Sequence, residues 1–133
     1  MSKRETSALI AQMDPVLDEV SYRFVLVCPS IAPQALGTAI GTFREAEGVT
    51  AIIPSSLANE LDQPGPDLAK ITLQVHSDLE EIGLTAAVSG ALAEGGIACN
   101  VVAAFHHDHL FVPWDSKQDA LKILQLLSQD AHR

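Results

Sequence analysis

Residues 97–113 read IACNVVAAFHHDHLFVP, in which two short apolar runs flank a cluster of histidines. The runs 97–105 and 109–113 are rich in small and β-branched residues, which is typical of strands, and Pro113 ends the second one. Only His106, His107 and Asp108 separate them. A β-hairpin is therefore predicted, with antiparallel strands and these polar residues at its tip.

The segments around this hairpin predict a strand and two helices. AKITLQV at 69–75 alternates like a strand and follows the loop-forming cluster DQPGPD. One helical stripe is formed by Leu84, Ala87, Val88, Ala91 and Leu92, and Gly95-Gly96 would end that helix. A second stripe, after a helix start at Ser116, is formed by Ala120, Ile123, Leu124 and Leu127. The predicted order is strand, loop, helix, strand, strand, helix.

The start of the first helix can be placed in two ways. Ser77 followed by Glu80 is the pattern of a capping box, which would begin the helix there. Against this, the apolar stripe does not continue upstream of Leu84, and Gly83 lies at the break. We therefore predict a loop or single turn over 76–82 and a main helix that opens at Gly83, with the capping box as the alternative.

The N-terminal half repeats this order in a weaker form. It contains a strand at 22–27, a short helix at 33–40, a hairpin at 42–54 and one or two helical turns at 55–61. In both halves the hairpin ends in proline, Pro54 or Pro113, and an apolar helical stretch follows. This similarity indicates a degenerate internal repeat.

The repeat predicts an α+β fold of the ferredoxin-like βαββαβ type, with antiparallel sheets and the helices on one face. We expect two tandem units, at 1–65 and 69–131. The second unit has no room for a fourth strand after its last helix, so we expect the halves to share or interlace strands. Incomplete units leave apolar sheet surface exposed, which also predicts a homo-oligomer.

Composition and charge limit the class of protein. The chain has 133 residues and a net charge of −9, so nucleic acid and anionic membrane surfaces are unfavourable partners. No apolar run approaches a membrane span, and no signal-peptide core is present, so a cytoplasmic protein is expected. Cys28 and Cys99 lie in apolar runs without metal-ligand spacing, which predicts buried free thiols.

Two stretches resemble a known family. VHSDLEEIGLTAAVSGALAEGGIACNVVAAFHHDHLFVP (75–113) is similar to the C-terminal ACT domain of small bacterial proteins, and FREAEGVTAIIP (43–54) is similar to their divergent N-terminal ACT-like segment. The resemblance implies a non-catalytic module, without a cofactor, that binds an amino acid or a similar metabolite and regulates enzymes or senses nutrients. Tandem ACT domains also occur in amino-acid sensors and feedback-inhibited kinases.

The resemblance also implies where the ligand lies, namely at an interface between two ACT units, beneath the turn that joins the first strand to the first helix. The family's Pro-Gly in this turn appears here as Ile82-Gly83, so the glycine is kept and the proline is not. The implied ligand-binding residues are His76, Ser77, Asp78, Ile82, Gly83, Leu84, Thr85, Asn100 and Val101.

Elementary chemistry points to the same place. A helix that opens at Gly83 leaves backbone N–H groups without intrahelical acceptors, and these donors suit a carboxylate. Asn100 is the one strongly polar side chain between Ile97 and Phe105, and a buried amide requires partners. A backbone group or a dimer contact is the structural alternative to a ligand. The acidic cluster at 78–81 is either a solvated loop or a partner for a cationic group.

The histidines do not predict a metal or catalytic site. On strands alternate residues share a face, so His107 and His109 could converge while His106 would point away, and His76 is distant in sequence. No catalytic triad, phosphate loop or carboxylate pair is recognisable. Three hypotheses remain: a metabolite-binding regulatory module, a ligand-free structural or interaction module, and a small metal-dependent enzyme.

Overall fold

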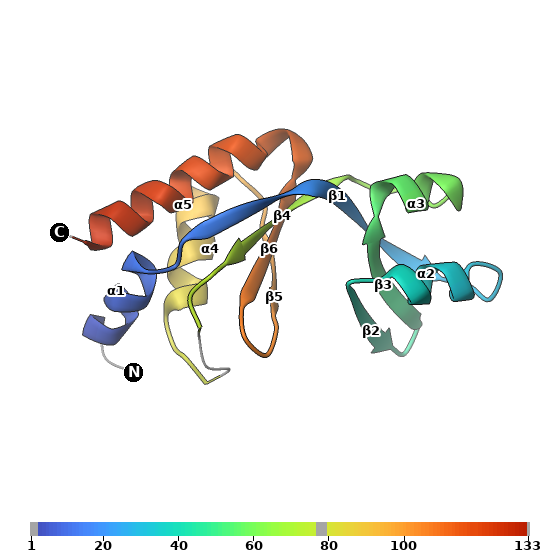
Figure 1. Ribbon diagram of the computed structural model, residues 1–133, viewed down its shortest axis with the longest axis horizontal. Coiled ribbons are helices and arrows are strands. Elements are labelled where there is room, and N and C mark those ends of the chain that lie inside the picture. The colour runs from blue at the N-terminus through green and yellow to red at the C-terminus, as the bar shows by residue number, and fades with distance from the viewer. Residues whose placement is uncertain (1–2, 77–79, 133) are drawn as a thin grey trace. The chain divides into compact units, whose positions relative to one another are not determined.

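The computed structural model describes residues 3–76 and 80–132, and the chain divides into two compact units (Figure 1). The first unit combines Met1–Asp18 with Ala69–Arg133, and the second is Glu19–Leu68. The first unit therefore takes a segment from each end of the chain. The predicted limits of the tandem repeats, 1–65 and 69–131, stay a prediction, because they divide the chain by repeat and not by compactness.

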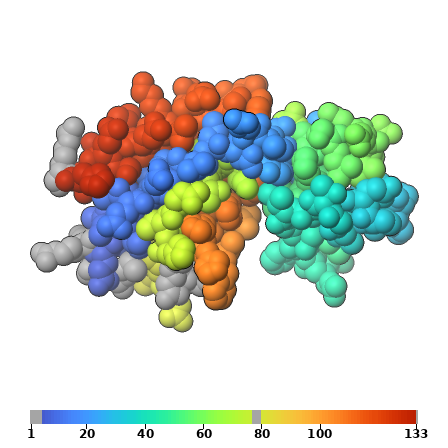
Figure 2. All heavy atoms as spheres, in the orientation of Figure 1, coloured from blue at the N-terminus to red at the C-terminus, as the bar shows by residue number. Residues whose placement is uncertain are grey.

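The first unit has three α-helices and four strands in the described part of the chain. Its elements are α1 (Lys3–Ala11), the beginning of β1 (Pro15–Val27), β4 (Leu68–Leu73), α4 (Leu84–Glu94), β5 (Asn100–Ala103), β6 (Asp108–Pro113), the 3-10 turn η1 (Trp114–Ser116) and α5 (Lys117–Ala131). Its strands follow the order β1-β4-β6-β5. In the space-filling view (Figure 2), atoms of α1 and of the start of β1 lie directly beneath the C-terminal part of α5.

The beginning of β1 supplies the strand that the second half of the chain lacks. The order β4-α4-β5-β6-α5 is a βαββα unit, which needs a fourth strand beside its first one to complete the ferredoxin-like sheet. Residues 15–18 of β1 belong to this unit, and β1 neighbours β4 in the sheet. The predicted α+β fold with shared strands is confirmed.

The second unit contains the remainder of β1, α2 (Ala32–Thr38), β2 (Gly41–Glu45), β3 (Gly48–Pro54) and α3 (Ser55–Glu60). Strand β3 pairs antiparallel with both neighbours, as in the pairs Val25 with Ala51 and Phe43 with Thr50. The predicted hairpin and both short helices are present. Strand β1 is longer than the predicted 22–27, and α1 had no counterpart in the sequence prediction.

Each unit has its own core, and the predicted helical stripes face it. Leu84, Val88 and Leu92 of α4 and Ala120 and Leu124 of α5 are fully buried in the core of the first unit. The core of the second unit is smaller and is formed by Val25, Ile31, Ala35, Ala51, Ile53 and Ala58. The amphipathic spacing therefore identified the buried faces of both long helices.

Helix α4 ends at the predicted glycines through a Schellman motif. The N–H of Gly96 donates to the carbonyl of Ala93 at 3.0 Å, and the N–H of Ile97 donates to the carbonyl of Leu92 at 2.9 Å. Gly96 has φ of +75°, which a residue without a Cβ adopts at little cost. The side chains of Leu92 and Ile97 both lie in the core of the first unit, so this cap also directs the chain toward β5.

Three sequence expectations need correction. Strand β5 covers only Asn100–Ala103, and the hairpin tip is formed by Phe105 and His106, because Ala104 N donates to the His107 carbonyl at 3.0 Å. Asp108 therefore lies on β6 and is buried, not at the tip. Cys28 and Cys99 are free thiols, but Cys28 is exposed in the loop after β1.

None of the described helices is long and apolar enough to cross a membrane.

Candidate functional site

The turn between β4 and α4 carries most of the site residues implied by the sequence. Gly83 is the N-cap of α4 and has φ of +110°, a conformation that other residues rarely adopt. The helix begins at Leu84, so the predicted opening at Gly83 is right to within one residue. The capping-box alternative places the start at Ser77, which lies outside the described residues together with Asp78.

The sequence predicted that the N–H groups at the start of α4 have no acceptor, but the first of them has one. The N–H of Leu84 donates to both carboxylate oxygens of Glu81, at 3.1 and 3.3 Å. The first intrahelical bond runs from Ala87 N to the Gly83 carbonyl. The N–H groups of Thr85 and Ala86 therefore remain without an intrahelical acceptor. This helix end already binds one carboxylate and offers two further donors.

Helix α1 packs against this turn, which the sequence did not predict. The Thr6 hydroxyl donates to the carbonyl of Ile82 at 3.0 Å. A Cβ placed on Gly83 would lie 3.0 Å from Thr6 Cγ2 and 3.2 Å from Thr6 Oγ1. The side of Gly83 on which a side chain would project is thus occupied by Thr6. A molecule that approaches the turn has to come from another side.

The remaining turn residues differ in what they can offer. Ile82 is 69% exposed, and Thr85 is also exposed, so both side chains are available to a ligand or partner. Leu84 is fully buried in the core and can contribute only its backbone. The turn therefore presents main-chain donors, one glutamate and two accessible side chains.

Three histidines gather beside the turn, contrary to the expectation that His76 is distant. The ring of His76 stacks on that of His106, with centroids 5.4 Å apart, and meets the ring of His107 edge-on at 5.0 Å. Phe105 packs edge-on against His106 at 5.0 Å. The end of β4 and the β5–β6 tip both lie at the lower edge of the first unit in Figure 1. His76 follows the end of β4, and His106 and His107 precede β6, the neighbour of β4 in the sheet, so the three histidines meet at the same edge.

His109 does not join this cluster. Its Nδ1 atom lies 2.8 Å from the Thr72 hydroxyl on β4, so a hydrogen bond links β6 to β4. Desolvation lowers the pKa of His109 most, and the nearby charges of Lys70 and His107 lower it further, while Asp108 opposes the shift. The expectation that His106 would point away from the other histidines is wrong, because its ring stacks on that of His76.

Asn100 is exposed, so the premise of a buried amide is wrong. It begins β5, at the edge of the strand order, and pairs with Phe111, while Ala103 at the other end of β5 pairs with Asp108 beside the tip. Three residues along a strand correspond to about 10 Å. Val101, which pairs with Leu110, is partly buried against the core. Within one unit, Asn100 is thus separated from the β4–α4 turn by β6 and by the length of β5.

The described residues do not contain a group of three or more His, Cys, Asp or Glu side chains that could hold a metal ion. The histidine rings stack and meet edge-on, which does not aim their nitrogen atoms at one point. What the turn offers chemically is backbone N–H donors at the start of α4 and the carboxylate of Glu81.

Comparison with known families assigns both halves of the chain. One family model described as an ACT domain matches residues 3–69, and another, also described as an ACT domain, matches residues 65–125. The chain belongs to the ACT domain family. No curated protein was found that matches the sequence.

Solved structures extend this assignment. A Vibrio cholerae protein of unknown function, described as a possible transport protein, is 39% identical, with a TM-score of 0.79 over 93% of this chain and 96% of that one. A protein from Agobacterium tumefaciens shares the fold at 20% identity, with a TM-score of 0.67 over 82% and 84% of the two chains. The regulatory subunit of aspartate kinase from Thermus thermophilus also shares it, at 13% identity, with a TM-score of 0.62 over 85% and 95%. This ACT protein therefore has the tandem architecture of an aspartate kinase regulatory subunit.

Proposed function

We propose that this ACT protein is a non-catalytic regulatory module that binds an amino acid or a related zwitterion at the β4–α4 turn. The observation that carries the proposal is the capped helix start, where a carboxylate already accepts the Leu84 N–H. A ligand carboxylate would accept the N–H groups of Thr85 and Ala86, where the positive end of the helix dipole favours it. The adjacent Glu81 carboxylate would face the ligand ammonium group. A zwitterion needs both of these partners.

We further propose that the site is completed by Asn100 and Val101 of another ACT unit in a second copy of the chain. Asn100 is exposed at an edge strand, where a partner could approach it. The second unit adds exposed apolar surface, since Phe43 and Leu26 are 71% and 60% exposed and both pair with Thr50. Exposed apolar surface on a sheet face favours association between copies. Light scattering that shows only a 14.2 kDa monomer at micromolar concentration would contradict this part.

A thermal-shift screen against the amino acids and common nucleobases tests the ligand. At 100 times its dissociation constant, a ligand stabilises the folded state by about 2.7 kcal/mol. For a chain of this size that is a melting shift on the order of 10 °C. A shift produced by an amino acid supports the proposal. If no compound shifts the wild-type protein, the module is better described as a ligand-free interaction domain.

Two pairs of variants locate the site. Asn100→Ala should abolish most of the shift without unfolding the protein, because the side chain is exposed, whereas Asn59→Ala removes an exposed amide from α3 and should keep the shift. Glu81→Gln should weaken binding, because an amide oxygen can still cap Leu84 N but carries no charge for the ammonium group. Glu94→Gln at the opposite end of α4 is its control. If the two variants of a pair change the ligand-induced melting shift equally, the assignment of Asn100 or of Glu81 to the site is refuted.

A further inference from the structure

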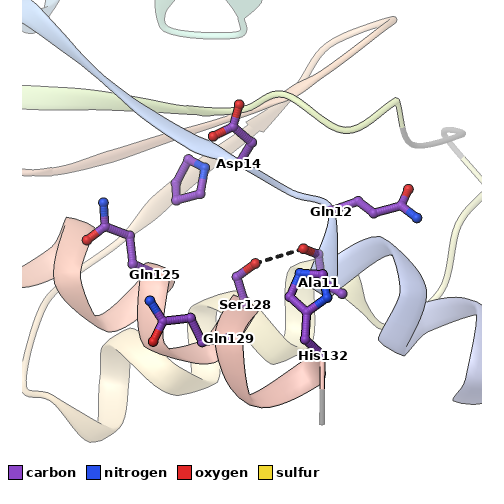
Figure 3. Close-up of a pocket in the computed structure, with 8 residues that line it drawn as sticks. Ala11, Gln12, Asp14, Gln125, Ser128, Gln129 and His132 are labelled. Carbon is purple, nitrogen blue, oxygen red and sulfur yellow. Dashed lines mark hydrogen bonds between the residues drawn. The ribbon is translucent and has the colours of Figure 1, made fainter.

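The first unit has a hollow where α1 ends, β1 begins and α5 passes by, but its polar side chains do not converge (Figure 3). The Asp14 carboxylate and the Gln125 and Gln129 amides point away from one another. The Ser128 hydroxyl donates to the Ala11 carbonyl at 2.9 Å, a bond within the chain itself. The hollow therefore offers a ligand no common point of attachment, whereas the edge of the sheet at β5 offers a regular row of backbone groups.

Strand β5 is an edge strand that carries no protection against pairing. It stands last in the strand order β2-β3-β1-β4-β6-β5. Natural edge strands are commonly protected by charged side chains or proline. Strand β2, the other edge, carries Arg44 and Glu45. Residues 97–105 contain neither a charged residue nor a proline, and both Asn100 and Ala103 are exposed.

The hairpin determines which backbone groups of β5 face outward. Beside the two-residue tip, the N–H of Ala104 donates to the His107 carbonyl at 3.0 Å. Along an antiparallel pair of strands, hydrogen-bonded and non-hydrogen-bonded positions alternate. Val102, two residues before Ala104, therefore bonds to β6, whereas Val101 and Ala103 direct their N–H and C=O groups away from β6. In the described part of the chain, no strand lies beside β5 on that side.

The outward groups of β5 are complementary to those of a second copy in the antiparallel direction. With a two-fold axis at Val102, Val101 of each copy lies opposite Ala103 of the other. Two such pairs give about four backbone hydrogen bonds between the copies. Each chain has a net charge of −9, so copies repel one another, and a contact without charged side chains adds nothing to that repulsion. Dimers with a two-fold axis are also the commonest symmetric assembly.

The antiparallel direction also brings Asn100 to the end of the partner at which the β4–α4 turn lies. In a pairing about Val102, Asn100 of one copy lies opposite Ala104 of the other. Ala104 directly precedes the hairpin tip, and there the ring of His106 stacks on that of His76, with centroids 5.4 Å apart. Asn100, which is far from the turn of its own unit, is thus beside the tip and the turn of the second copy.

We propose that two copies of this chain pair their β5 strands antiparallel about Val102, and that this pairing brings Asn100 of each copy to the hairpin tip beside the β4–α4 turn of the other. The proposal deepens the proposed function and rests on it for the role of Asn100. The pairing of the strands requires no ligand, so it is tested separately from ligand binding.

A disulfide at the two-fold axis tests the pairing. In a background with Cys28→Ser and Cys99→Ala, Val102→Cys places two thiols in a non-hydrogen-bonded pair, where Cα atoms are about 4.5 Å apart. Disulfides form at Cα separations of about 4.4–6.8 Å. Mild oxidation should therefore convert most of this variant to a covalent dimer on a non-reducing gel. Thr42→Cys in the same background is the matched control, because Thr42 is exposed on the other edge strand, β2, and it should stay monomeric on the gel.

Charges at the axis provide a second test, which needs no oxidation. Val102→Lys and Val102→Glu each place two like charges opposite one another across the pair of strands. The dimer dissociation constant, measured by analytical ultracentrifugation, should rise by about fivefold, the factor that 1 kcal/mol represents. An equal mixture of the two variants should instead form a heterodimer that associates more tightly than either variant alone. Circular dichroism of each variant controls for unfolding.

The proposal is overturned if Val102→Cys forms no more covalent dimer than Thr42→Cys, or if mixing the Lys and Glu variants does not restore association. A wild-type dimer in light scattering without the Val102→Cys crosslink also overturns the β5 pairing, and it leaves the ligand at the β4–α4 turn as a separate question. A crosslink in a protein that no amino acid stabilises supports the pairing and contradicts the proposed ligand.

Discussion

Replacing Gly83 by alanine tests whether the β4–α4 turn is held in the conformation described. With φ of +110°, an alanine would adopt a conformation that costs about 1–3 kcal/mol. Its Cβ would also lie 3.0 Å from Thr6 Cγ2, so α1 would have to yield by a few tenths of an ångström. We expect a loss of about 2 kcal/mol in the free energy of unfolding.

Gly90, in the interior of α4, provides the matched control for the N-cap residue Gly83. A Cβ at Gly90 would meet nothing within 4 Å, and the residue lies in the interior of α4. Gly90→Ala should therefore stabilise the protein, by up to about 1 kcal/mol, through helix propensity alone. The alanine substitutions at the N-cap and in the interior of α4 should thus differ by about 3 kcal/mol, with opposite signs.

Urea denaturation followed by circular dichroism measures both changes as shifts in midpoint at constant slope. Thr6→Ser keeps the hydroxyl that bonds to the Ile82 carbonyl and removes the methyl group that crowds Gly83. The double variant Thr6→Ser/Gly83→Ala should therefore recover part of the loss. Unfolding free energies of Gly83→Ala and Gly90→Ala that agree within 0.5 kcal/mol, a typical error for such comparisons, would refute the reasoning.

Three further predictions concern acid stability and metal. The Arg23 guanidinium donates to Asp67 at 2.8 Å and holds the pKa of that carboxyl below its usual range. The stabilisation that the ionised Asp67 gives the folded protein is complete above the unfolded-state pKa, near 3.9, and is lost as pH falls through the folded-state pKa. Asp67→Asn should flatten the acid limb of a plot of melting temperature against pH. Desolvation lowers the pKa of His109 in the folded protein. As pH falls, His109 is therefore protonated in the unfolded chain before it is protonated in the folded one, and the free energy of unfolding should decrease below about pH 6.5. His109→Gln should reduce that fall. A chelator should leave the melting temperature unchanged, and a loss that zinc restores would instead point to the histidines around His76.

The local elements of this protein could be predicted from its sequence because their signals are local. The stripes of α4 and α5 have helical spacing, and their apolar residues are those that the core buries. The glycines at 95 and 96 end α4 where predicted, since a positive φ after a helix favours glycine. Repetition of one βαββα order in both halves was enough to predict the fold class.

Contacts between distant segments were decided only in the tertiary structure. Periodicity shows which face of an element is apolar, but not which other segment will cover it. The sequence therefore did not predict that Thr6 would pack on Gly83, or that His76 would meet His106 and His107.

The register of the strands, which also depends on the tertiary structure, decided where single residues lie. A tip formed by Phe105 and His106, one position earlier than predicted, moves Asp108 from the tip into a buried strand, because a shift of one residue exchanges the faces of a strand. Asn100 was expected to be buried because its neighbours are apolar, yet it lies exposed at the start of an edge strand. Apolar neighbours determine that a segment is a strand, while exposure depends on which strands and helices pack beside it.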